Sequence, residues 1–170
     1  MNAVVAARRL SGSRTVLAAL VIVTAGLAAA SGVLLARVQA SQGAQDARTA
    51  AVAAARKDVP ALLSYSYQTF RANLSRARAA ATGGFRASYT KLMTGQVEPA
   101  ALARHVVTRA SVSAASVVSA QPGSATLLMF VSEQTKTAAR QEAVLNDTAL
   151  RVTMREVNGT WLVAGLVPRS

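Results

Sequence analysis

Hydrophobic residues follow three successive patterns along the chain. Residues 15–36, TVLAALVIVTAGLAAASGVLLA, contain no charged side chain, and residues 37–58 are rich in alanine and poor in large apolar side chains. From residue 59 onward the apolar positions recur first at helical spacing and then, after His105, at strand-like spacing. A helix over residues 15–36 would span roughly 33 Å, enough to cross a hydrocarbon core. The pattern therefore predicts a tail (1–14), a transmembrane helix (15–36), a helical stalk (37–58) and a domain (59–170).

The charges that flank the apolar span predict its orientation. Arg8, Arg9 and Arg14 precede the span and no acidic residue does. The excess of positive charge places the N-terminus in the cytoplasm. We therefore expect a single-pass protein of the cell membrane whose C-terminal domain is extracytoplasmic. The alternative is a cleaved signal peptide, with a cleavage site at Ala28-Ala29-Ala30, but the long continuation of the apolar run favours an anchor.

The stretch VPALLSYSYQTF, residues 59–70, is compatible with two structures. Polar and aromatic residues alternate over residues 64–67, as in a half-buried strand. At 100° per residue, however, the larger apolar residues form one stripe, which favours a helix. Asp58 is placed to cap a new helix that begins near Pro60. On that helix Ser66 would face the interior.

Two further helical segments are expected before residue 105. Gly83-Gly84 interrupts the helix, and apolar residues at helical spacing then predict a second one that ends near Gly95. Glu98-Pro99 opens a short third segment, with proline in the first turn, where it is tolerated.

The C-terminal part of the chain has the pattern of an antiparallel sheet. A change of phase near Ala114-Ala115 predicts a bulge, and residues 125–131 are apolar on both faces, as in a central strand. Asn158-Gly159 is a strong signal for a two-residue hairpin turn. With that turn Met154 opposes Val163, and two sets of side chains point to opposite faces. The core face would carry Leu150, Val152, Met154, Trp161, Val163 and Val167, and the other face Arg151, Arg155, Leu162 and Leu166.

These elements predict an α+β domain of about three helices on a four-stranded antiparallel sheet. The second face of the sheet would be only partly polar, so a partner chain or a second copy could cover it. The candidate docking face consists of Leu162, Leu166, Arg151 and Arg155.

Charge adds one further candidate surface. The formal net charge is +12, and no acidic residue lies between Asp58 and Glu98. The basic residues of that segment either form a solvated face or contact anionic headgroups or an acidic partner: Arg71, Arg76, Arg78, Arg86 and Lys91. An extracytoplasmic domain disfavours nucleic acid as a partner.

The sequence offers no set of residues for catalysis. There is no cysteine, the one histidine is His105, and the seven acidic residues are scattered. General acid–base chemistry needs two groups placed together. We therefore expect no catalytic residues, no metal site, no cofactor and no enzymatic activity.

The order and spacing of several segments resemble the Mce-associated membrane proteins of actinobacteria. The segments are LLSYSY, TGGFRASY, VVSAQPGSATLLMFVSEQ and NGTWLVAGLVP. The resemblance implies one N-terminal anchor and a cone-shaped domain of the nuclear-transport-factor or SnoaL-like type, a fold shared with the assembly subunit of type IV secretion systems. Ser66 stands where that family often has an acidic residue, so any role of such an acid is not expected here.

The same resemblance implies a non-catalytic accessory role in Mce complexes, which import lipids such as sterols and fatty acids. The partners would then be Mce complex proteins and other membrane subunits. One alternative is a scaffold of the type IV secretion kind, and another is a stand-alone lipid-binding module. For the latter, candidate residues for the lining of a cavity are Ser66, Tyr67, Phe70, Phe85, Tyr89 and Trp161. The simpler interpretation of the aromatic residues, Phe130 included, is that they fill the core.

Overall fold

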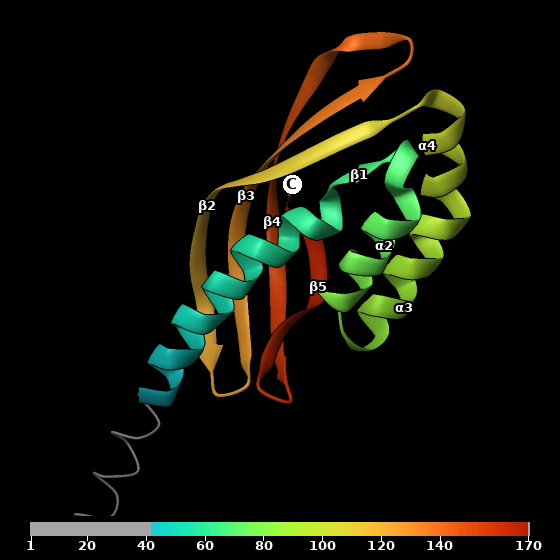
Figure 1. The fold of residues 1–170 in the computed structure, drawn as a ribbon. Coiled ribbons are helices and arrows are strands. Elements are labelled where there is room, and N and C mark those ends of the chain that lie inside the picture. Colours follow the sequence, from blue (N-terminus) through green and yellow to red (C-terminus); the bar gives the residue numbers. More distant parts are fainter. Residues whose placement is uncertain (1–41, 170) are drawn as a thin grey trace, which may run out of the picture. The chain divides into compact units, whose positions relative to one another are not determined.

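A five-stranded antiparallel sheet with helices on one face dominates the computed structural model, which describes residues 42–169 (Figure 1). The expected tail (1–14), transmembrane helix (15–36) and first part of the stalk lie outside these residues. Within residues 42–169, no helix is both long and apolar enough to cross a membrane.

The first helix covers residues 42–63 and packs its small side chains against the sheet. Its buried positions recur every third or fourth residue, which places them on one side of the helix: Ala47, Ala51, Ala55, Val59 and Leu62. The helix continues through Pro60 rather than restarting there as expected. Proline removes one helical N–H, but Val59 and Leu62 are buried on either side of it and hold the helix in place. Residues 43–58, expected as a stalk, thus pack with the domain.

The segment after the first helix is not helical, so the prediction for residues 64–69 was wrong. It forms β1 (Tyr65–Ser66) and a 3-10 turn, η1 (Tyr67–Thr69), before α2 (Phe70–Ala79) begins. β1 pairs with residues 107–108. The Ser64 hydroxyl accepts a hydrogen bond from the Ala110 N–H at 2.9 Å, and the Tyr67 N–H donates to the Val106 carbonyl at 3.0 Å. Hydrogen bonds to a distant strand thus replace the local helical ones.

The next helices form one nearly continuous run. α3 (Gly83–Leu92) passes through a π-helical turn, η2 (Met93–Val97), into α4 (Glu98–Arg104). The expected end at Gly95 is therefore wrong, while Pro99 lies in the first turn of α4 as predicted. The run ends at His105, which adopts the left-handed conformation with φ 52°.

The sheet is a meander in which each strand pairs with the next. After β1 come β2 (Val107–Gln121), β3 (Ser124–Thr137), β4 (Arg140–Val157) and β5 (Thr160–Arg169). The sheet therefore has one strand more than predicted. The predicted bulge is confirmed by a register shift between Val112 and Ala114. The predicted hairpin is also confirmed, because Asn158 and Gly159 both have positive φ and Val157 opposes Thr160.

A second register shift, in β5, changes which side chains face the core. Met154 opposes Val163 as predicted, but Thr153 opposes Gly165, so Ala164 has no partner in the ladder. Leu166 then opposes Val152 on the core face. Val167 opposes Arg151 on the other face and is 59% exposed. The predicted faces of Leu166 and Val167 were therefore wrong.

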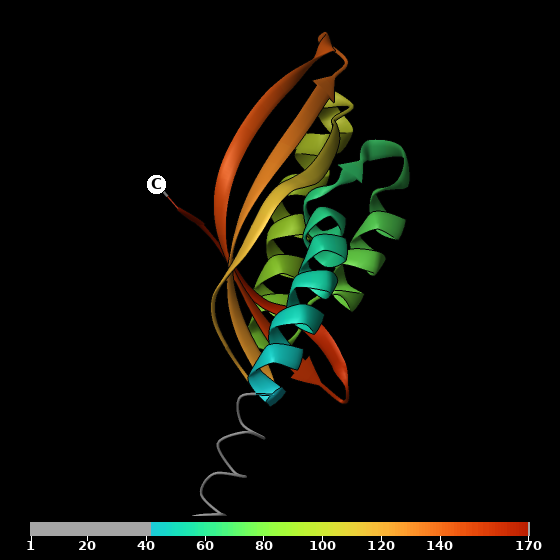
Figure 2. The same cartoon turned by 90° about the vertical axis from the view of Figure 1, so that its left-hand side faces the viewer.

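The core lies between the helices and one face of the sheet, which we call the inner face; the helix-free side is the outer face (Figure 2). Inner-face side chains pack against the first helix and against Ala77 and Ala81. The residues at the centre of this core are at most 1% exposed: Leu127, Met129, Val131, Val152, Met154 and Val163.

The hairpin of β3 and β4 projects past the helices at the end of the domain opposite the start of the first helix (Figures 1 and 2). We call residues 132–148 the arm. β5 ends opposite Ala149, so within the arm β4 pairs only with β3. The Ala138 N–H donates to the Arg104 carbonyl at 3.0 Å, which ties the tip of the arm to the end of α4.

Candidate functional site

The six residues expected to line one cavity lie in different parts of the domain. Phe70 is buried in a small cluster with Met93 and Ala101. Phe85 and Trp161 are partly buried at the border of the main core. Ser66 and Tyr67 lie outside both clusters, beside the edge of β2. The structure therefore does not assemble the expected lining.

Tyr89, another of the six, has a structural contact. Its hydroxyl donates a hydrogen bond of 2.7 Å to the Leu62 carbonyl, and its ring lies 5.9 Å from that of Phe85. Burial raises the pKa of Tyr89 to about 12, with a smaller contribution from Tyr65. The carbonyls in the last turn of a helix lack helical partners. The Tyr89 hydroxyl thus provides a hydrogen-bond partner for one such carbonyl of the first helix and links α3 to that helix.

Trp161 borders an open groove of about 650 Å³ between the first helix, the end of α2 and the β4–β5 turn. Alanines from the first helix and α2 contribute to its wall, and Lys57, Asp58 and Arg76 are among the remaining residues. Burial raises the pKa of Asp58, and the charge of Lys57 opposes that shift.

The basic residues of the helices do not form a uniform surface. Arg71 makes a salt bridge with Glu98 at 3.7 Å. The Arg86 Nε donates to the Ala81 carbonyl at 2.7 Å, which supports the loop before α3. Arg78 and Arg86 border one shallow hollow, whereas Arg76 borders the groove beside Trp161. Lys91 lies in the last turn of α3.

The expected docking face is only partly assembled on the outer face of the sheet. Leu162 opposes Arg155 there, as predicted, and Arg151 lies on the same face. Leu166 is on the inner face and packs against the core.

Another apolar surface occupies the outer face around Phe130, which we expected in the core. Phe130 is 47% exposed and lies between Ala114 and Ala149 in the register. One row further along, Arg151 stands between Leu128 and Val167. We call this surface the outer patch: Ala114, Leu128, Phe130, Ala149 and Val167. The alternation with the buried Met129 was the signal in the sequence that could have placed Phe130 outside.

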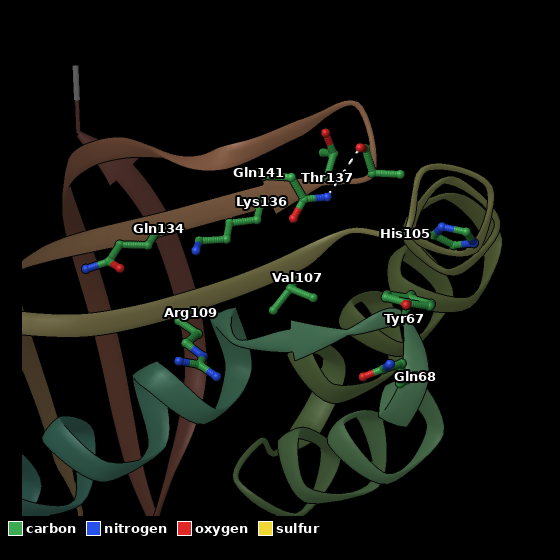
Figure 3. A pocket seen from close by; sticks show the side chains of 10 residues that line it. Tyr67, Gln68, His105, Val107, Arg109, Gln134, Lys136, Thr137 and Gln141 are labelled. Atoms are coloured by element: carbon green, nitrogen blue, oxygen red, sulfur yellow. Dashed lines mark hydrogen bonds between the residues drawn. The ribbon is translucent and has the colours of Figure 1, made fainter.

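A polar hollow between the tip of the arm and the end of α4 was not predicted at all (Figure 3). It has a volume of about 490 Å³. One wall is the ring of Tyr67 stacked on that of His105, with centroids 4.6 Å apart and planes 30° apart. The opposite side carries Arg109 and Lys136, from β2 and β3. No sequence pattern links Tyr67 to His105; they meet because β1 joins the edge of β2.

Over residues 42–169, no group of three or more His, Cys, Asp or Glu side chains is placed to hold a metal ion. The imidazole of His105 has an aromatic ring as its stacking partner, and the ten residues that line its hollow include no carboxylate.

Comparison with known proteins identifies relatives and a shared fold. The family model described as "Uncharacterized protein Rv1363c/MT1408-like" matches residues 12–166. The "Outer membrane protein Rv1973" of Mycobacterium tuberculosis is 34% identical over 142 residues, which cover 84% of this chain and 88% of that protein. The "Uncharacterized protein Rv1362c" of the same organism is also 34% identical, over 72% of this chain and 56% of the relative.

Similar solved structures include proteins of type IV secretion systems. An IcmL-like type IV secretion protein of Legionella pneumophila matches with a TM-score of 0.59 and 14% identity, over 71% of this chain and 91% of that one. CagV, a VirB8 homologue of Helicobacter pylori, matches with a TM-score of 0.57 and 12% identity, over 69% and 95%. A periplasmic fragment of TraM has a TM-score of 0.59 at 11% identity, over 72% and 96%. At such low identity these likenesses establish the fold alone, an α+β domain as expected.

Proposed function

The chain belongs to the Rv1363c/MT1408-like family, and from that premise we propose that it is a non-catalytic scaffold subunit of a membrane complex. The outer patch is the surface that binds a partner protein. The partners are the proteins of an Mce-type lipid importer, beside which residues 15–36 anchor an extracytoplasmic domain. The resemblance of the sequence to Mce-associated proteins supports this choice, and the name of the relative Rv1973 supports a place at a membrane.

The observation that carries the proposal is the contrast between a filled inner face and an uncovered outer patch. Phe130 and Val167 are 47% and 59% exposed, on β3 and β5, with Ala149 and Arg151 of β4 between them on the same face. Exposed apolar patches commonly mark interaction sites. Aromatic and arginine side chains, here Phe130 and Arg151, are enriched at protein interfaces.

The alternative of a lipid-binding module has less support from the packing. The space between helices and sheet is filled by side chains such as Leu62, Met129 and Met154. A scaffold of the type IV secretion kind would use the same fold and differ in its partners. Identifying the partners therefore distinguishes it from a scaffold of an Mce-type importer.

The test is affinity purification of the tagged full-length protein from its native membranes in mild detergent, with co-purifying proteins identified by mass spectrometry. We expect the wild type to recover Mce substrate-binding proteins and their permease. The double variant Phe130→Asp, Val167→Asp should lose them, because two buried carboxylates at the interface would be unpaired. Recovery of secretion-channel components would favour the other scaffold, and recovery of lipid alone would favour the lipid-binding module.

The matched control is Leu92→Asp on α3, since Leu92 is 47% exposed, like Phe130, but belongs to the helical layer. The control should retain all partners. Equal recovery by the wild type and by a folded Phe130→Asp, Val167→Asp protein would remove the outer patch from the proposal.

A further inference from the structure

We propose that the hollow between the tip of the arm and the end of α4 binds a phosphate ester of a hydroxyl-rich molecule, either free or as the headgroup of a lipid. The hollow is separate from the outer patch in its lining residues, so the proposal does not depend on the proposed scaffold function.

The first reason is an excess of positive charge with no counter-charge in the lining. Val107 opposes Lys136 and Arg109 opposes Gln134, so Arg109 and Lys136 occupy diagonal positions on one face of adjacent strands. Like charges so placed repel each other. Neither makes an ion pair within the part of the chain that the structure describes. A bound anion would remove the repulsion and accept hydrogen bonds from both side chains.

The second reason is the type of the remaining donors. Gln68, Gln134 and Gln141 line the hollow, and Thr137 lies near Gln141 (Figure 3). The Gln141 amide also donates to the Ala138 carbonyl at 3.4 Å. Amides donate and accept hydrogen bonds, as hydroxyl groups do. They therefore suit the sugar or polyol part of a ligand rather than its phosphate.

The third reason is the flat wall of the hollow. The stacked rings of Tyr67 and His105 present an apolar surface next to polar groups. The wall is held in position from both sides: the Tyr67 N–H donates to the Val106 carbonyl, and the left-handed turn at His105 ends α4. A volume of about 490 Å³ exceeds what a phosphate ion alone would fill and is within the range of small-molecule sites.

The experiment measures binding to the full-length protein in a neutral detergent, with three probes: inorganic phosphate, glucose 6-phosphate and phosphatidylinositol in mixed micelles. Isothermal titration calorimetry follows the two soluble probes, and retention of the lipid on the immobilised protein follows the third. We expect saturable binding of glucose 6-phosphate that is tighter than that of inorganic phosphate. Tighter binding of phosphatidylinositol than of phosphatidylcholine would assign the site to a headgroup, and binding of glucose 6-phosphate alone would assign it to a free ester.

The variant Arg109→Gln, Lys136→Gln should weaken binding by about tenfold or more, since each removed contact is a charge-assisted hydrogen bond. The variant Arg151→Gln, Arg155→Gln is the control, because it removes the same charge from the outer face of β4 and leaves the hollow intact. Absence of saturable binding to the wild type, or an equal loss in the control, would overturn the proposal. So would binding of inorganic phosphate that is as tight as that of glucose 6-phosphate.

Discussion

The two faces of the sheet differ in solvent exposure far more than the sequence of any one strand suggests. On β3, Met129 is fully buried against the helices, and its neighbour Phe130 is 47% exposed on the outer face. Both side chains are large and apolar, so hydrophobicity alone does not tell which one stabilises the fold. Position relative to the helices distinguishes them, because the helices within residues 42–169 cover the inner face only (Figure 2). Apolar residues on the inner face contribute to folding, whereas those on the outer face are free for binding.

The largest expected difference in stability is between the truncations of two neighbouring residues on β3, Met129 and Phe130. Met129→Ala is expected to lower the free energy of unfolding by about 2–5 kcal/mol, because it leaves a cavity in a packed core. Phe130→Ala should cost about 1 kcal/mol or less, as substitutions at exposed positions do. Denaturant unfolding of the full-length protein in detergent, followed by the fluorescence of Trp161, measures both. Similar losses for the two variants would contradict the contrast between the faces.

A smaller effect should distinguish Leu166 from Val167, the pair whose faces the bulge in β5 exchanges. Leu166→Ala should destabilise the domain by about 1–2 kcal/mol, less than at a fully buried site, because Leu166 is only partly buried. Val167→Ala should change the stability by less than about 0.5 kcal/mol. The same unfolding measurement applies. A larger loss for Val167→Ala would mean that β5 continues without the bulge, with Val167 facing the core.

The smallest effect concerns Asp58, at the rim of the inner face. Burial raises the pKa of its carboxyl above the ordinary 3.8, so the folded protein binds this proton more tightly than the unfolded chain does. Stability should therefore fall as the pH rises through the raised pKa, and Asp58→Asn should remove that fall.

At neutral pH Asp58→Asn should then be the more stable protein, by less than about 1 kcal/mol because Asp58 is partly exposed to solvent. The difference should disappear below pH 3.8, where the carboxyl is protonated in both states. Unfolding curves of the two proteins across this pH range test the sign. A wild type that gains stability relative to the variant with rising pH would contradict the burial of this carboxyl.

Features fixed by local chemistry could be predicted from the sequence. Asn158-Gly159 favours the positive φ values that a two-residue hairpin needs, and it correctly paired Met154 with Val163. The buried Leu150, Val152 and Met154 likewise follow from plain alternation.

Features that depend on distant partners could not be predicted in this way. The apolar residues within 59–74 do recur at helical spacing. Nevertheless β1 forms, because the edge of β2 supplies hydrogen bonds to residues 64–67. The hollow beside His105 exists only as a result of that pairing. For the bulge in β5 a signal was present: Gly165 is an isolated glycine within a strand, which often marks such a site.

The alanine stripe of the first helix also has a consequence for biosynthesis. Ala51 and Ala55 leave the ribosome long before β3, β4 and β5, whose buried side chains share a core with them, because β3 begins only at Ser124. Chains with transiently exposed hydrophobic surface tend to aggregate while they fold. Methyl groups expose less apolar area than leucine or phenylalanine side chains would. Until the strands are synthesised, the helix therefore offers little apolar surface for non-native contacts. The choice of alanine on this helix thus suits a segment that is made before the strands that cover it.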